Sequence, residues 1–103
     1  MTDPALQFIG GDLVESLATA SAHDPATGTA IGGFAVGDES DAAAAIGYAR
    51  AAFDLTDWSR DRTARHRVLT QMSDLLEERA DDFVAALARE NGKTLAEAGF
   101  EIY

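Results

Sequence analysis

Cysteine is absent from this 103-residue chain. Without a thiol, the chain cannot form a disulfide, bind a metal through thiolates or use cysteine as a nucleophile. Lysine is almost absent too, because Lys93 is the only one and arginines supply the other basic side chains. Lys93 directly follows a glycine that predicts the end of a helix. We therefore expect its positive charge to interact favourably with the carbonyl end of that helix, and we do not expect it to act in catalysis.

Long apolar runs are also missing. No stretch approaches the ~20 residues that a membrane-spanning helix needs. The first residues include Asp3 and no basic cluster, so a secretory signal is not expected. These absences predict a cytoplasmic protein.

Basic charge is scarce relative to acidic charge. Eighteen carboxylates against eight basic side chains give a net charge of −10 at neutral pH. Such a surface repels phosphate backbones, so we expect neither nucleic acid nor an anionic membrane as a partner. Because lysine is so scarce, the composition also resembles that of proteins adapted to high salt, where screening relieves the repulsion.

Motifs that carry chemistry are likewise missing. The sequence contains neither the glycine-rich dinucleotide fingerprint nor a P-loop. His23 and His66 have no spacing that suggests a shared metal, and each adjacent carboxylate pair diverges by about 100° on a helix. We therefore assign no catalytic and no cofactor-binding residue within the chain.

The residues present predict an α+β chain of one domain or less. Residues 1–37 are expected to form short strands, with a glycine turn at Gly10-Gly11 and a second turn at Asp24–Gly28. The expected strand residues are Gln7–Ile9, Leu13-Val14, Leu17–His23 and Thr29–Val36.

Residues 38–103 are expected to form three to four helices. Asp38 and Asp61 are plausible N-caps, and Ala80-Asp81-Asp82 should interrupt or bend the second helical run. Apolar residues recur at helical spacing on each helix, and the stripe of the second one comprises Val68, Leu69, Met72, Leu75 and Leu76.

The last expected helix starts clearly but has no stop signal. Gly92 should end the preceding helix, and Thr94 with Glu97 matches a capping box. Leu95, Ala98 and Ile102 are expected to point inward. Since few residues follow, the chain is expected to be cut within this helix.

Five motifs in this order resemble the amino-terminal segment of the aldehyde dehydrogenase superfamily. They are Phe8-Ile9-Gly10-Gly11, Asp24-Pro25-Ala26-Thr27-Gly28, Ala49-Arg50-Ala51-Ala52-Phe53, Trp58-Ser59 and Glu90-Asn91-Gly92-Lys93. The resemblance implies that residues 1–103 belong to a Rossmann-like nucleotide-binding domain. It also implies that the full-length enzyme oxidises aldehydes to carboxylic acids with NAD or NADP.

In that family, the cysteine nucleophile and the cofactor-binding residues lie beyond the segment that this chain resembles. We therefore expect the chain alone to be inactive and to bind no cofactor. The resemblance also implies a monovalent-cation site, formed by the main-chain carbonyls of Ala22 and His23 and the carboxylate of Glu90. Hard cations prefer such oxygen ligands.

Two classes of partner follow from this interpretation. A complementing carboxy-terminal chain of a split enzyme would supply the missing chemistry. Self-association would cover the apolar stripes. The alternative is a free-standing acidic helical module for protein interaction, which should bury its own stripes.

Overall fold

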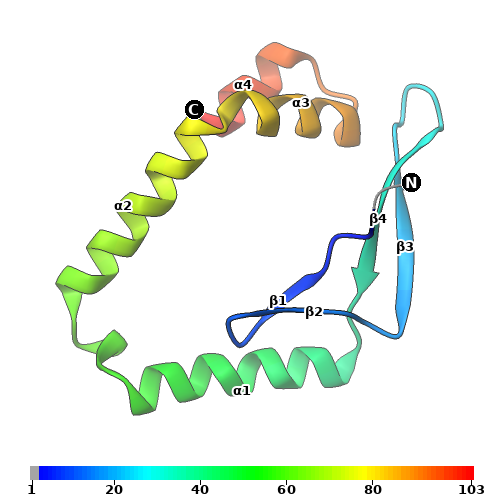
Figure 1. Ribbon diagram of the computed structural model, residues 1–103. Helices are drawn as coiled ribbons and strands as arrows, with labels where there is room; N and C mark the ends of the chain where they lie inside the picture. Colours follow the sequence, from blue (N-terminus) through cyan, green and yellow to red (C-terminus); the bar gives the residue numbers. More distant parts are fainter. Residues whose placement is uncertain (1–2) are drawn as a thin grey trace. The chain divides into compact units, whose positions relative to one another are not determined.

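The computed structural model describes residues 3–103 as four short strands followed by helices (Figure 1). The elements are β1 (Gln7–Ile9), β2 (Asp12–Val14), β3 (Ala18–His23), β4 (Ala30–Val36), α1 (Glu39–Leu55), the short 3-10 helix η1 (Asp57–Ser59), α2 (Arg62–Glu78), α3 (Ala80–Asn91) and α4 (Leu95–Ile102). This order confirms the α+β prediction.

The chain divides into two compact units. The first contains the residues up to Ala22 together with Gly32–Arg62, and the second contains His23–Ile31 with Thr63–Tyr103. The tip between β3 and β4 thus groups with the later helices, so the units cut across the predicted division at residue 37. The assignment of residues 1–103 to one nucleotide-binding domain stays a prediction.

In the first unit, β1 and β2 form an antiparallel hairpin. Its register pairs Gln7 with Val14 and Ile9 with Asp12. Gly10 and Gly11 have φ angles of 65° and 90°, as a two-residue turn with two positive φ values requires. A Cβ at Gly10 would lie 2.8 Å from the ring of Tyr48, so the hairpin turn packs directly on α1.

The chain before β1 extends the second sheet. β3 and β4 pair with each other, and Ala5 forms a parallel bridge with Phe34. The amide of Ala5 donates to the carbonyl of Gly33 at 2.9 Å. The amide of Ala35 donates back to the carbonyl of Ala5 at 2.8 Å.

Helix α1 begins where the sequence predicts. Asp38 is its N-cap, and its carboxylate accepts the amide of Asp41 at 3.0 Å while the Asp41 carboxylate accepts the amide of Asp38 at 3.0 Å. The hydroxyl of Ser40 also donates to Asp38 at 2.7 Å. The Asp41 amide, and then the Ser40 hydroxyl, lower the pKa of the Asp38 carboxyl.

In the second unit, the predicted break between two helices is confirmed. α2 ends at Glu78 and α3 begins at Ala80, so the acidic pair Asp81-Asp82 lies in the first turn of α3. Negative charge is favourable there because the first turn carries the positive end of the helix dipole. α3 and α4 then pack side by side (Figure 1).

Neither unit forms a core of large side chains. Within residues 3–103, the buried hydrophobic residues are Ala80, which is 2% exposed, and Ala98, which is 0% exposed. No large side chain in that range is fully buried. The apolar stripes of α1 and α2 are therefore largely accessible within their own units.

One inward prediction is wrong. Ala98 is buried and Ile102 is half-buried, but Leu95 is 66% exposed. Leu95 is the first residue of α4, and the face that packs on α3 follows Ala98 instead. In the part of the chain that the structure describes, no helix combines the length and apolarity needed to cross a membrane.

Candidate functional site

The Pro25 turn and the Gly92 corner meet in the second unit, although many residues separate them in the sequence. A Cβ placed on Gly92 would lie 2.9 Å from Cγ of Pro25, closer than real Cβ atoms approach. Two motifs of the amino-terminal resemblance therefore form one contact. We call residues 24–28 and 90–94, which carry this contact, the corner site.

Local chemistry shapes the turn on one side of the corner site. The Asp24 carboxylate accepts the amide of Ala26 at 2.8 Å, and the Asp24 carbonyl accepts the amide of Gly28 at 2.7 Å. Gly28 has a φ of 73°, which glycine adopts without steric cost. The predicted turn is thus confirmed, and its hydrogen bonds hold Pro25 at the tip.

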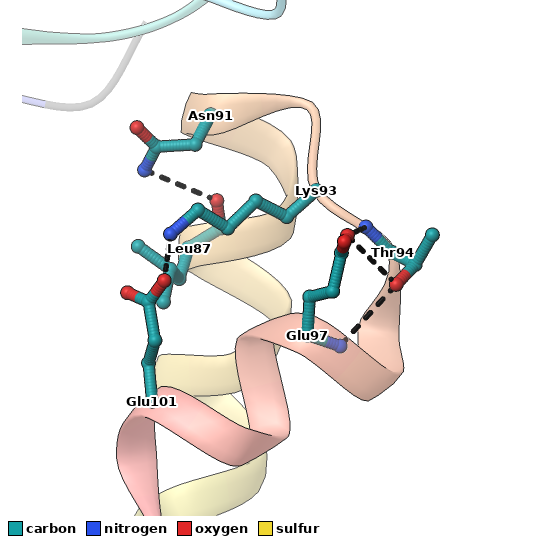
Figure 2. Close-up of polar contacts among 6 residues, drawn as sticks. All are labelled: Leu87, Asn91, Lys93, Thr94, Glu97 and Glu101. Carbon is teal, nitrogen blue, oxygen red and sulfur yellow. Dashed lines mark hydrogen bonds and ion pairs between the residues drawn. The ribbon is translucent and has the colours of Figure 1, made fainter.

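A helix end shapes the other side. Gly92 has a φ of 69° and its amide donates to the carbonyl of Ala88 at 2.9 Å, so it is the left-handed stop of α3. The side-chain amide of Asn91 donates to the main-chain carbonyl of Leu87 at 3.4 Å (Figure 2). The predicted helix end is confirmed, and the chain reverses here into α4.

Lys93 and Glu101 bridge this reversal. The Lys93 ammonium forms an ion pair with the Glu101 carboxylate near the end of α4 (Figure 2). The contribution of such a partly exposed pair to stability is modest. We expected Lys93 to act on the carbonyl end of α3. The chain reversal instead brings Lys93 alongside α4. Lys93 lies outside that helix, so the helical spacing of the sequence does not predict its pairing with Glu101.

The capping box at α4 completes the corner site (Figure 2). The hydroxyl of Thr94 accepts the amide of Glu97 at 3.2 Å, and the carboxylate of Glu97 accepts the amide of Thr94 at 3.1 Å and its hydroxyl at 3.0 Å. Both residues were predicted in these roles. The Thr94 amide, then the Thr94 hydroxyl, lower the pKa of the Glu97 carboxyl, and the charge of Lys93 adds to this.

This lowered pKa predicts an acid-sensitive helix start. The stabilisation is complete above the ordinary glutamate pKa of about 4.3 and is lost as pH falls through the lower folded-state pKa. Glu97→Gln keeps an acceptor but does not titrate, so its helix content should fall less between pH 5 and pH 2 than that of the parent chain. Circular dichroism measures this change.

The matched control for that experiment is Thr94→Ala, which removes the two hydrogen bonds of the Thr94 hydroxyl but keeps the main-chain amide that donates to the Glu97 carboxylate. It should therefore keep much of the acid response, because the amide that lowers the Glu97 pKa most remains, but should weaken α4 at neutral pH by about 1 kcal/mol. An acid response of Glu97→Gln equal to that of the parent chain would contradict the role of the capping box.

A hollow of about 340 Å³ adjoins the corner site. Its lining comes from the turn and from α3 and α4: Asp24, Ala26, Ala85, Ala88, Arg89, Gly92, Lys93 and Leu95. Half of these residues are alanine or glycine, and Asp24, Arg89 and Lys93 supply charge of both signs.

The three residues of the predicted cation site lie on two elements. Ala22 and His23 end β3, and Glu90 lies in the last turn of α3 with an exposed side chain. Residues 3–103 contain no cluster of three or more His, Cys, Asp or Glu side chains that could hold a metal. Because the predicted ligands include main-chain carbonyls, this result does not test the site, and it stays a prediction.

Two features of the described residues are unsuited to a dinucleotide. Helix N-termini commonly bind phosphates, but those of α1 and α4 are occupied by the carboxylates of Asp38 and Glu97. A hollow of about 570 Å³ beside the β1–β2 turn has a mostly apolar lining that includes Phe8, Tyr48 and Leu55 and no basic residue. Neither feature suits a diphosphate, and the absence of a cofactor site within the chain stays a prediction.

Comparisons with known proteins agree with the sequence motifs. The family model described as the aldehyde dehydrogenase family matches residues 14–103. The chain belongs to the aldehyde dehydrogenase family. Aldehyde dehydrogenase 1 of Tanacetum cinerariifolium is 37% identical over 89 residues, which are 84% of this chain and 18% of that protein.

Solved aldehyde dehydrogenases share the same arrangement of elements. A point mutant of betaine aldehyde dehydrogenase from Staphylococcus aureus, solved in complex with NAD+, has a TM-score of 0.89 at 28% identity and covers 95% of this chain and 20% of its own. The NAD-dependent aldehyde dehydrogenase from Sinorhizobium meliloti has a TM-score of 0.90 at 25% identity, covering 99% of this chain and 21% of its own. The predicted amino-terminal aldehyde dehydrogenase segment and its fold class are thereby confirmed.

The chain spans about a fifth of the length of the aldehyde dehydrogenases that it matches. Sequence reasoning found both halves of the corner site as separate motifs. It missed their contact and the Lys93–Glu101 pair, because neither follows a local period. Gly92 was the one sequence feature that could have indicated the contact, because the Pro25 ring can approach this closely only a residue that has no Cβ.

Proposed function

We propose that this chain is part of the nucleotide-binding domain of an NAD(P)-dependent aldehyde dehydrogenase in the cytoplasm, and that alone it does not oxidise aldehydes. The observation that supports this best is the match of 95% or more of the chain to only a fifth of two enzymes, one solved in complex with NAD+ and the other an NAD-dependent aldehyde dehydrogenase. The chain has no cysteine for a covalent thiohemiacetal. Another chain segment must therefore supply the nucleophile.

Activity assays test this proposal directly. The purified chain, incubated with NAD or NADP and a panel of aldehydes, should give no more reduced cofactor than a heat-denatured control. Sustained reduction of NAD or NADP that rises with the concentration of the chain would overturn it.

A complementation assay tests the positive half of the proposal. We propose a complementing chain as partner, and the remainder of a related aldehyde dehydrogenase, expressed without its first fifth, can stand in for it. Adding the 103-residue chain should restore soluble, cofactor-binding protein above the remainder alone. Gly92→Ala should complement less well, because it disrupts the corner site.

The alternative function is a free-standing acidic interaction module. It predicts a monomer with a cooperative melt and no dye-accessible apolar surface. The exposed stripes of α1 and α2 favour the enzyme segment instead, because a self-contained module needs to cover such surfaces.

Salt should stabilise the chain. At a net charge of −10, the chain repels itself, and at 1 M salt the Debye length falls to about 3 Å. The midpoint of thermal unfolding should therefore rise between low salt and molar KCl. An unchanged or lower midpoint would remove the interpretation of the composition as salt-adapted.

A further inference from the structure

Asn91 and Gly92 form a pair with covalent chemistry of its own. Asn91 is the only asparagine in the chain, and its side chain is exposed. The main-chain nitrogen that follows an asparagine can attack the side-chain carbonyl of that asparagine. Glycine allows this attack best, because it has no Cβ to obstruct the approach. The two glutamines, Gln7 and Gln71, would have to close a larger ring, and neither precedes a glycine.

The folded end of α3 engages both reacting groups in hydrogen bonds. The main-chain amide of Gly92 donates to the carbonyl of Ala88 at 2.9 Å. The side-chain amide of Asn91 donates to the carbonyl of Leu87 at 3.4 Å, so this side chain is turned back along α3 (Figure 2). The attack therefore requires that the last turn of α3 opens and that both hydrogen bonds break.

The last turn of α3 has little to hold it closed. The bond from Asn91 to Leu87 is longer than a typical N–H···O hydrogen bond. Among the described residues, the second unit buries Ala80 and Ala98 but no large side chain. Exposed helix ends with few buried contacts open at a low free energy, so the turn should open often enough to react.

We propose that Asn91 is a site of spontaneous deamidation, and that opening of the last turn of α3 sets its rate. In the open turn, the Gly92 nitrogen loses its proton to solvent and bonds to the side-chain carbonyl carbon of Asn91. The side-chain nitrogen leaves as ammonia, and a succinimide ring remains. Water then adds to either ring carbonyl and breaks the C–N bond there, which gives aspartate or isoaspartate at position 91.

Either product weakens the same helix end. A carboxylate at position 91 lies beside Glu90, at the negative end of the helix dipole. Isoaspartate also adds a main-chain atom directly before Gly92, so the Gly92 amide loses its register with the carbonyl of Ala88. Deamidation thus converts a transient opening of α3 into a lasting one.

Peptide mapping by mass spectrometry tests the site on the full chain at mildly alkaline pH. Asn91 should deamidate in denaturant, and at least about tenfold more slowly in buffer, which corresponds to an opening free energy of about 1.4 kcal/mol. An isoaspartyl methyltransferase should label the product. Asn91→Gln should abolish this labelling. In denaturant, where folding has no influence, Gly92→Ala should slow the reaction because its Cβ obstructs the attack.

Ala98→Leu tests the gate, because it should loosen the packing of α4 on α3 without changing Asn91 or Gly92. In buffer, it should deamidate at least about threefold faster than the parent chain. Ala96→Leu, at an exposed position of the same helix, is the matched control and should leave the rate unchanged. In denaturant, both variants should react as fast as the parent chain.

Hydrogen exchange gives a second measure of the gate. The Gly92 amide should exchange faster in Ala98→Leu and not in Ala96→Leu, because exchange needs the same opening as deamidation. The proposal fails if Asn91 does not deamidate in denaturant, or if the rates in buffer and in denaturant are equal. It also fails if Ala98→Leu and Ala96→Leu deamidate equally fast in buffer.

Discussion

Gly92→Ala is expected to destabilise the second unit by roughly 2–3 kcal/mol. Two penalties add at this position. The left-handed φ of 69° strains any residue with a Cβ, and the new methyl group would lie 2.9 Å from the ring of Pro25. Chemical denaturation followed by circular dichroism measures the loss.

Gly28→Ala is the matched control for this substitution. Gly28 has a similar φ of 73°, but no atom lies within 4 Å of where its Cβ would be. It should therefore show the strain alone, about 1 kcal/mol. The difference between the two variants measures the contact with Pro25.

Pro25→Ala provides the second half of the test. It removes the ring atom that the new methyl group would contact. The double variant Gly92→Ala with Pro25→Ala should therefore lose less stability than the sum of the losses of the two single variants. A coupling of about 1 kcal/mol is expected for groups in direct contact. Equal losses for Gly92→Ala and Gly28→Ala would contradict the contact.

Ala98→Leu is expected to separate α4 from α3 and to cost roughly 1–3 kcal/mol. Ala98 is 0% exposed at the face where the two helices pack, so a larger side chain has no space to occupy. The expected result is loss of α4 helix content and an earlier unfolding midpoint. Circular dichroism with thermal unfolding measures both.

Ala96→Leu is the control on the same helix. Ala96 is exposed, and leucine forms helices nearly as well as alanine does, so this variant should stay within about 0.5 kcal/mol of the parent chain. If Ala98→Leu were tolerated equally well, the packing of α4 on α3 would not depend on a small residue at position 98.

The sequence by itself determined where the elements begin and end. Asp38, Gly92 and the Thr94–Glu97 pair act on amides within a few residues of themselves, so their roles can be read from spacing alone. The Gly10-Gly11 turn belongs to the same class, because positive φ angles are a local property of glycine. The family assignment also came from such short motifs in order.

Tertiary structure alone decided which of these motifs meet. The contact of Pro25 with Gly92, and that of Gly10 with Tyr48, depend on how distant segments return to one another. The same holds for burial: periodicity placed Leu95 and Ala98 on one face, but packing on α3 buries only Ala98. The helical period of apolar residues specifies which residues share a helix face. The neighbouring element decides how much of that face is in contact and buried.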